Sequence, residues 1–222
     1  MDLVVVGAGK IGSQLIEIAT GDGNDVVVIE RDEGVANRIS ARYDCLVLCA
    51  DATSEGTLQE AGIDRADAVI STTNVDAVNV MVMLLAQEHE VPALVSVVHE
   101  PEHIQVFDKI GVNVIENPQR LIAKHLFHSV RHPAVVDFME LGDDAEVFEI
   151  VVGDGAPITG VTLATATAHG LFPEESLVVA IQRAGEVLFP SGESEIEGGD
   201  LVTLFARTSR IDELAEVFGN GA

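Results

Sequence analysis

The sequence contains no tryptophan, one tyrosine and only two cysteines among its 222 residues. Because hydrophobic residues still make up 47% of the chain, we expect a core built from Val, Ile, Leu and Ala side chains. Cys45 and Cys49 lie on one predicted strand, about 13 Å apart at roughly 3.3 Å per residue, which is too far for a disulfide. We interpret both as buried apolar residues of a protein in a reducing cytosol.

Long hydrophobic runs are also absent. The longest apolar stretch, Ala77 to Ala86, contains Asn79 and falls well short of the roughly 20 residues that cross a bilayer. The first predicted strand begins at residue 2, so we expect no secretory signal. These features predict a cytoplasmic protein without direct membrane insertion.

Positive charge is scarce. The chain has 12 Lys and Arg against 37 Asp and Glu, a net charge of −25, and only three of its basic residues are lysines. Such a surface repels nucleic acid and anionic lipid, which excludes both as direct partners. The acids are spread through segments predicted to fold, which favours adaptation to high salt. The alternative, a surface for multivalent cations, has no acidic loop with ligand-like spacing to support it.

The first thirty residues carry the strongest pattern. Asp2 to Val6 is a short apolar run typical of a buried strand. It leads into a G-x-G-x-x-G motif and an apolar helical pattern, and a second predicted strand, Asp25 to Ile29, ends at Glu30. The motif consists of Gly7, Ala8, Gly9, Lys10, Ile11 and Gly12.

This order of elements predicts a nucleotide-binding βαβ unit. Gly7 allows the tight turn, Gly9 lets the backbone approach a pyrophosphate, and Gly12 allows close packing of helix on strand. The helix N-terminus supplies unpaired N–H groups for phosphates. Glu30 follows the glycines at about the spacing of 20 residues expected for an acid that binds a ribose hydroxyl. The alternative is a structural glycine turn without a ligand.

Further strands and helices alternate up to residue 117, which predicts a Rossmann-like, doubly wound parallel sheet, an α/β fold. We expect helices at about residues 31–42, 54–61, 76–90 and 101–109, and strands at 45–49, 66–71, 93–98 and 111–115. Ser54 is predicted to cap its helix.

The pattern changes after residue 117. Residues 118–133 are predicted to form one helix, and residues 134–222 combine strands separated by turn signals with two short helices. Strands joined in hairpins with two helices indicate a small α+β domain.

Two sequence blocks carry a family resemblance. The first comprises the glycine motif, Glu30, Asp51 to Thr53 and Ala68 to Asn79, and the second comprises Pro157 to Leu163, Val179 to Gly185, Phe189 to Gly192 and Gly199 to Asp200. In this order, joined by one helix, they resemble the TrkA-type regulators of K⁺ conductance (RCK proteins). These are cytosolic, nucleotide-binding subunits of Trk and Ktr potassium uptake systems.

The resemblance implies a set of site residues. Gly7, Ala8, Gly9, Lys10 and Ile11 would form the phosphate loop, Glu30 would hold the adenosine ribose and Arg31 would lie over the adenine. Asp51 and Ala52 would contact the adenine edge, and Thr73 and Asn74 the pyrophosphate or second ribose. One position departs from the family: Val97 stands where many members have an arginine that reaches the nucleotide.

The expected ligand is NAD(H), with ADP or ATP as the alternative. Glu30 disfavours NADP, because a 2′-phosphate would face the carboxylate. No residue indicates whether the C-terminal domain binds a second ligand, as it binds a cyclic dinucleotide in some relatives.

Two further acids and three histidines have competing interpretations. Asp51 is interpreted as a ligand residue, with a turn residue as the alternative. Asp76 is interpreted as a cap of the following helix rather than a catalytic acid. His125, His128 and His132 share one side of the linking helix, where surface pairing is favoured over a metal site or a pH sensor.

The function implied by the resemblance is regulatory rather than enzymatic. The ligand would favour one conformation of the protein and so gate a membrane-embedded Trk or Ktr potassium transporter at the inner face of the membrane. A homodimer or ring is expected, with the apolar segment Val80 to Leu85 as a candidate contact. The alternatives are a small NAD-dependent oxidoreductase and a structural regulator with a vestigial nucleotide site. The region after residue 133 has one histidine and no cysteine, which gives little support to an acid–base centre.

Overall fold

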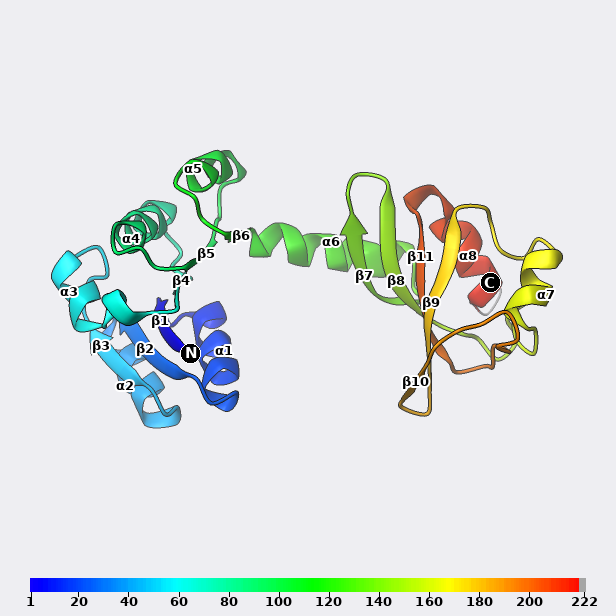
Figure 1. Cartoon of the computed structure of the whole chain (residues 1–222), viewed down its shortest axis with the longest axis horizontal. Coiled ribbons are helices and arrows are strands. Elements are labelled where there is room, and N and C mark those ends of the chain that lie inside the picture. The colour runs from blue at the N-terminus through cyan, green and yellow to red at the C-terminus, as the bar shows by residue number, and fades with distance from the viewer. Residues whose placement is uncertain (220–222) are drawn as a thin grey trace. The chain divides into compact units, whose positions relative to one another are not determined.

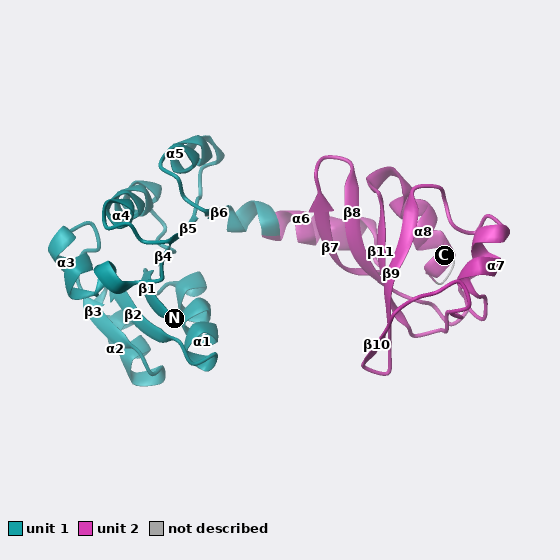
Figure 2. Cartoon of the chain, viewed as in Figure 1, with its two compact units in different colours: residues 1–121 teal, residues 122–222 magenta. Residues whose placement is uncertain are grey.

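The computed structural model describes residues 1–219 and shows two compact units. The first comprises Met1–Leu121 and the second Ile122–Ala222 (Figure 2).

The first unit is built on six parallel strands in the order β3-β2-β1-β4-β5-β6 (Figure 1). The strands are β1 (Asp2–Val6), β2 (Asp25–Glu30), β3 (Leu46–Cys49), β4 (Ala68–Ser71), β5 (Ala93–Val97) and β6 (Val114–Glu116). The helices between them are α1 (Lys10–Gly21), α2 (Glu33–Arg42), α3 (Glu55–Glu60), α4 (Asp76–Glu88) and α5 (Ile104–Lys109), with short 3₁₀ turns η1 (Ile63–Arg65) and η2 (Pro101–His103). The predicted doubly wound parallel sheet is therefore confirmed.

Helices cover both faces of this sheet, which explains why its strands are continuously apolar. Successive residues of β1 alternate between two cores: Leu3 and Val5 pack with Ile16 of α1 and Ile39 of α2. On the other face, Val4 and Val6 belong to a core completed by α3, α4 and α5. The side chains that these three helices contribute to it include Leu58, Val82, Met83 and Phe107.

The second unit contains an antiparallel sheet in the order β10-β9-β11-β8-β7. Its strands are β7 (Val135–Leu141), β8 (Ala145–Val151), β9 (Ser176–Arg183), β10 (Glu186–Leu188) and β11 (Leu201–Arg207). The helices are α7 (Leu163–Ala168) and α8 (Ile211–Phe218), the latter preceded by η3 (Thr208–Arg210). Side chains of α8 complete a core with Phe148, Ile150, Ile181 and Leu204 of the sheet, so the predicted small α+β domain is also confirmed.

One helix, α6 (Pro118–Arg131), includes the boundary at Leu121/Ile122. Within residues 1–219, no helix combines the length and the apolar character needed to cross a membrane.

The prediction that both cysteines are buried was wrong, and the predicted cap at Ser54 was confirmed in position only. Cys49 is exposed and Cys45 half-buried, because β3 is the edge strand of its sheet, where Leu46 is also 56% exposed. Ser54 lies at the N-cap of α3 but its side chain makes no capping hydrogen bond. The structure shows a side-chain cap at α2 instead, where Asp32 Oδ1 accepts from Val35 N at 2.8 Å.

Candidate functional site

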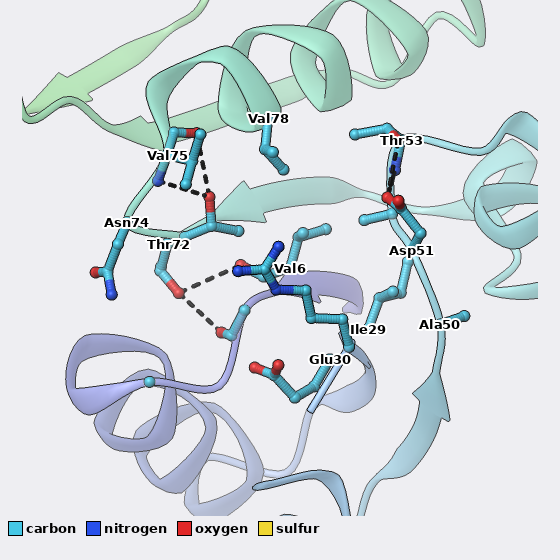
Figure 3. Close-up of a pocket in the computed structure, with 15 residues that line it drawn as sticks. Val6, Ile29, Glu30, Ala50, Asp51, Thr53, Thr72, Asn74, Val75 and Val78 are labelled. Atoms are coloured by element: carbon cyan, nitrogen blue, oxygen red, sulfur yellow. Dashed lines mark hydrogen bonds between the residues drawn. The ribbon is translucent and has the colours of Figure 1, made fainter. Parts of the chain in front are cut away.

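A cleft opens where four parallel strands of the first unit end. The chain order of the strands reverses between β1 and β4, and ligands of open α/β sheets bind outside the carboxyl ends of strands at such a switch point. The cleft has a volume of about 290 Å³ (Figure 3). It is lined by Val6, Gly7, Gly9, Ile29, Glu30, Arg31, Ala50, Asp51, Ala52, Thr53, Thr72, Thr73, Asn74, Val75 and Val78.

The three motif glycines have different surroundings. Gly7 has a φ of +87°, and a Cβ there would lie 3.2 Å from the Thr73 backbone nitrogen. A Cβ at Gly12 would lie 2.0 Å from the Gly7 carbonyl oxygen, so α1 can approach β1 only without a side chain at this position. A Cβ at Gly9 would meet no atom of residues 1–219 within 4 Å. The fold therefore needs Gly7 and Gly12, whereas Gly9 leaves open space beside the cleft.

Glu30 joins the tip of β2 to the glycine loop. Its Oε2 accepts a hydrogen bond from Ala8 N at 2.8 Å, and its Oε1 accepts one from Asp32 N at 2.9 Å. Both oxygens are therefore oriented by backbone donors at the cleft wall. Since each carboxylate oxygen has a further lone pair, the group can still accept from a ligand hydroxyl.

Thr72 was missed by the sequence analysis. Its side chain is buried, and its Oγ1 donates to the Gly7 carbonyl oxygen at 2.8 Å. This bond fixes the end of β4 against the glycine loop (Figure 3). A hydroxyl directly after a strand at the switch point is the signal that would have found it.

Thr73 lines the cleft, but its hydroxyl is turned toward α4. Its Oγ1 donates to Asn79 Oδ1 at 2.6 Å, and Ser71 Oγ donates to the same oxygen at 2.7 Å. The Asn79 amide donates in turn to the Thr73 and Val97 carbonyl oxygens at 3.1 and 3.2 Å. Asn79 is fully buried, so this network connects the cleft wall to the interior through α4 and the end of β5.

Asp51 stabilises the turn after β3 through its side chain and also lines the cleft. Its Oδ1 accepts from Thr53 N at 2.9 Å and from Thr53 Oγ1 at 2.8 Å. These two bonds, the backbone one first, lower the pKa of Asp51 below its ordinary value, so the group is ionised near neutral pH. The turn and ligand interpretations of Asp51 are therefore compatible.

Eight of the predicted site residues line this cleft and four do not. The eight are Gly7, Gly9, Glu30, Arg31, Asp51, Ala52, Thr73 and Asn74. Ala8 and Lys10 line a neighbouring cleft between α1 and α2, together with Arg38 and Arg42. Ile11 is exposed on α1 and Gly12 is buried where α1 meets β1.

The sequence analysis also missed several wall residues that are apolar or lie next to predicted ones. They are Val6, Ile29, Ala50, Thr53, Val75 and Val78. Three of them, Val6, Ile29 and Ala50, lie at or next to strand ends, a position that the predicted strands already indicated.

The prediction that Asp76 caps α4 was wrong. The N-cap position is Val75, and Asp76 is the first helical residue, 7% exposed. Its carboxylate accepts from the backbone nitrogens of His99 at 2.9 Å and Glu100 at 3.0 Å, and Oδ2 lies 2.8 Å from His103 Nδ1. Burial opposes ionisation of Asp76, but these hydrogen bonds outweigh it and hold its pKa below the ordinary value. Asp76 thus orders the segment after β5.

Val97 is not one of the described residues that line the cleft. Its side chain is 7% exposed and therefore buried at the end of β5. In the family that the sequence resembles, an arginine is common at this position, and here an apolar side chain takes its place.

His125, His128 and His132 each lie beside a carboxylate. His128 Nε2 lies 3.2 Å from Glu146 Oε2, and His132 Nδ1 lies 3.1 Å from Asp212 Oδ1. Burial, reinforced by the charge of His128, lowers the pKa of His132. Among the described residues, no group of three or more His, Cys, Asp or Glu is arranged to hold a metal ion.

Sequence comparison places the chain among potassium uptake proteins. Residues 3–118 match the TrkA-N domain and residues 147–219 the TrkA-C domain. A "Trk system potassium uptake protein TrkA homolog" of Methanothermobacter thermautotrophicus is 28% identical over 219 residues, covering 98% of this chain and 99% of that protein. The TrkA protein of Halomonas elongata is 24% identical over 93% of this chain and 46% of its own length.

Solved structures share the fold. The GsuK channel superposes with a TM-score of 0.69 at 17% identity, over 99% of this chain and 40% of the channel chain. A GsuK channel bound to NAD gives a TM-score of 0.68 at 19% identity, with the same coverage. A GsuK structure bound to ADP matches 59% of this chain and 34% of its own, with a TM-score of 0.52 at 26% identity.

The TrkA-N match alone covers more than half of the 222 residues, and the TrkA-C match follows it in the same chain. The chain therefore belongs to the TrkA family, whose members carry TrkA/RCK domains of potassium uptake systems.

Proposed function

We propose that this chain is a nucleotide-binding regulatory subunit that gates a membrane-embedded Trk or Ktr-type potassium transporter through a ligand-dependent conformational change. The observation that carries the proposal is the cleft at the switch point, where Gly9 leaves space for a phosphate and Glu30 presents an oriented carboxylate. Gating requires that the ligand bind one conformation more tightly than the other.

The proposed ligand is NAD(H), with ADP or ATP as the alternative. The backbone at Gly7 to Ile11 would hold the phosphates with Lys10 at their side, and Glu30 would bind the adenosine ribose. Arg31, Asp51 and Ala52 would surround the adenine, and Thr73 and Asn74 the pyrophosphate or second ribose. The NAD-bound and ADP-bound forms of GsuK support both candidates, and Glu30 disfavours a 2′-phosphate.

The proposed domain boundaries are residues 1–117 for nucleotide binding, 118–133 for the crossover helix and 134–222 for the C-terminal domain. A homodimer or ring is part of the proposal. It is supported by the apolar residues that α6 leaves exposed among those described, which are Leu121, Ile122, Leu126, Phe127 and Val130. The protein would work in the cytoplasm, at the inner face of the membrane through its transporter, and in high salt.

A regulatory role fits the cleft better than an oxidoreductase. Among the described residues that line it there is no histidine, cysteine or lysine, and its two carboxylates, Glu30 and Asp51, already accept backbone hydrogen bonds. A hydride-transfer enzyme needs a group that can exchange a proton with its substrate. Substrate-dependent change in nicotinamide absorbance would favour the oxidoreductase.

Calorimetric titration in molar KCl tests the site directly. NAD⁺, NADH, ADP and ATP are titrated into the wild-type protein and into Glu30→Ala, with Glu33→Ala as the matched control because Glu33 is an exposed glutamate nearby on α2. Loss of charge-assisted hydrogen bonds worth about 1.5–3 kcal/mol should weaken binding roughly 10- to 100-fold in Glu30→Ala only. Failure of all four nucleotides to bind the wild-type protein would contradict the proposal.

Gating itself is tested with potassium uptake by cells that carry the transporter and this subunit. Gly9→Asp places a carboxylate in the space left for the phosphate, so it should abolish nucleotide-dependent regulation. Regulation that survives Gly9→Asp would favour the vestigial-site alternative.

A further inference from the structure

The loop after β4, residues 73–75, lines the cleft and is connected to the start of α6 through one histidine. The Thr73 carbonyl oxygen accepts a hydrogen bond from His99 Nε2 at 3.0 Å. On the other side of the ring, His99 Nδ1 lies 2.8 Å from the side-chain nitrogen of Gln119. Thr73 lines the cleft, and Gln119 is in the first turn of α6. A neutral imidazole that donates from Nε2 and accepts at Nδ1 satisfies both contacts.

The backbone of His99 is anchored at both ends. Its nitrogen donates to Asp76 Oδ1 at 2.9 Å, and its carbonyl oxygen accepts from Asn117 Nδ2 at 3.1 Å. Asn117 also caps α6, because its Oδ1 accepts from Arg120 N at 2.9 Å. His99 therefore touches the beginning of α6 through its main chain and its ring.

Of the two groups that bind the Thr73 carbonyl, His99 is the less buried. Asn79 is fully buried and fixed by bonds to Ser71 and Val97. His99 is half-buried and leads to the exposed Gln119. The His99 ring therefore has more room than the Asn79 side chain to follow a shift of the Thr73 carbonyl.

We propose that His99 is a positioning residue that couples ligand occupancy of the cleft to the first turn of α6. The coupling rests on the proposed nucleotide site. A ligand that contacts residues 73–75 moves the Thr73 carbonyl, and the change reaches α6 because the His99 ring bridges the two. The segment that responds, residues 118–121, is where the chain leaves the first compact unit.

Hydrogen–deuterium exchange of the full chain measures the coupling, with NAD⁺ and ADP as probes and with affinities determined on the same samples. The variants are Gln119→Ala and His99→Gln. The amide nitrogen of a glutamine at position 99 lies about where Nε2 of the histidine does, so His99→Gln keeps the hydrogen bond to Thr73 and loses the contact with Gln119. Gln105→Ala is the matched control, since Gln105 is exposed on α5. His99→Asn is the reciprocal variant, which keeps the Gln119 contact and loses the Thr73 bond.

In the wild-type protein and in Gln105→Ala, ligand should slow amide exchange in residues 118–124 several-fold. In Gln119→Ala and His99→Gln, affinity should stay within about threefold of wild type while this ligand-induced change falls to less than about one third. His99→Asn should also lose the ligand-induced change. A purely structural role of His99 would alter exchange equally with and without ligand.

The outcomes separate the two proposals. The coupling is overturned if the wild-type protein binds ligand without any change in amide exchange of residues 118–124. It is also overturned if the ligand-induced change is undiminished in Gln119→Ala and His99→Gln. Either result leaves the proposed nucleotide site unaffected. Absence of binding to the wild-type protein overturns both.

Discussion

Gly9 and Gly12 are separated by one helical turn and are constrained by different neighbours. At Gly12 a Cβ would lie 2.0 Å from the Gly7 carbonyl oxygen, whereas at Gly9 it would meet no atom of the described part of the chain within 4 Å. Gly12→Ala should therefore lower the free energy of unfolding by about 1–3 kcal/mol, the usual cost of overpacking. Gly9→Ala should leave stability nearly unchanged and weaken nucleotide binding. Urea unfolding and calorimetric titration of both variants measure the two effects.

The pair is informative because each variant serves as a control for the other. Equal destabilisation by both would show that Gly9 is needed by the backbone rather than by a ligand. Unchanged affinity in a stable Gly9→Ala protein would mean that no phosphate approaches this position.

Asp76 links the start of α4 to the segment after β5, and its effect should depend on pH. Its folded-state pKa lies below the ordinary value, which is about 3.9 in an unfolded chain. The stability it contributes is therefore complete above about pH 4 and is lost as the pH falls through the folded-state pKa. Asp76→Asn should cost about 1–3 kcal/mol at neutral pH, because the amide nitrogen leaves a backbone donor without an acceptor.

Thermal melting of wild type and Asp76→Asn between pH 7 and pH 3 checks this expectation. The difference in melting temperature should shrink at the acid end of the range. Asp108→Asn is the control, since Asp108 is exposed on α5, and it should melt like wild type throughout. A difference between Asp76→Asn and wild type that is independent of pH would contradict the assignment.

At the scale of elements, the sequence was most informative where the pattern is local. Apolar runs of strand length alternate with helical patterns, and right-handed crossovers then restrict the sheet to very few strand orders. Both sheets and most helices of the structure could be predicted in this way. The glycine loop and Glu30 were equally accessible, because each belongs to one short segment.

What could not be predicted depends on contacts between distant segments. The donors to Asp76 lie more than twenty residues further along the chain, so its local position before a helix suggested a cap instead. The exposure of Cys49 follows from the edge position of β3, which no feature of β3 itself reveals. Thr72 acquires its role only because β4 lies beside β1.

Among the described helices, the linking helix α6 exposes the largest number of large apolar side chains. Leu126 and Phe127 are 66% and 69% exposed, which is unusual for a helix of an isolated protein. On α4, the previously expected contact, Met81 and Leu84 are 44% and 40% exposed. Because α6 exposes more apolar surface, we expect it to contribute the larger part of a contact between copies.

Light scattering during gel filtration compares the two helices. Phe127→Glu should convert a dimer or larger assembly to monomer, since it would bury a charge in the contact. Leu84→Glu should have a smaller effect, and Ile18→Glu is the control on the exposed side of α1. Dissociation by Leu84→Glu alone would assign the contact to α4, and a monomeric wild-type protein at physiological salt would contradict self-association.

For the whole molecule, the net charge of −25 should make stability depend on salt. Self-repulsion of the acids opposes the compact state, and raising ionic strength from 0.1 to 1 M shortens the Debye length from about 10 Å to about 3 Å. We expect the melting temperature to rise by roughly 10 °C in this interval, which corresponds to about 3–5 kcal/mol for a chain of this size. Screening requires that KCl and NaCl act equally. A similar rise with millimolar MgCl₂ would instead support a surface that binds multivalent cations, and a melting temperature independent of salt would contradict both explanations of the acidic composition.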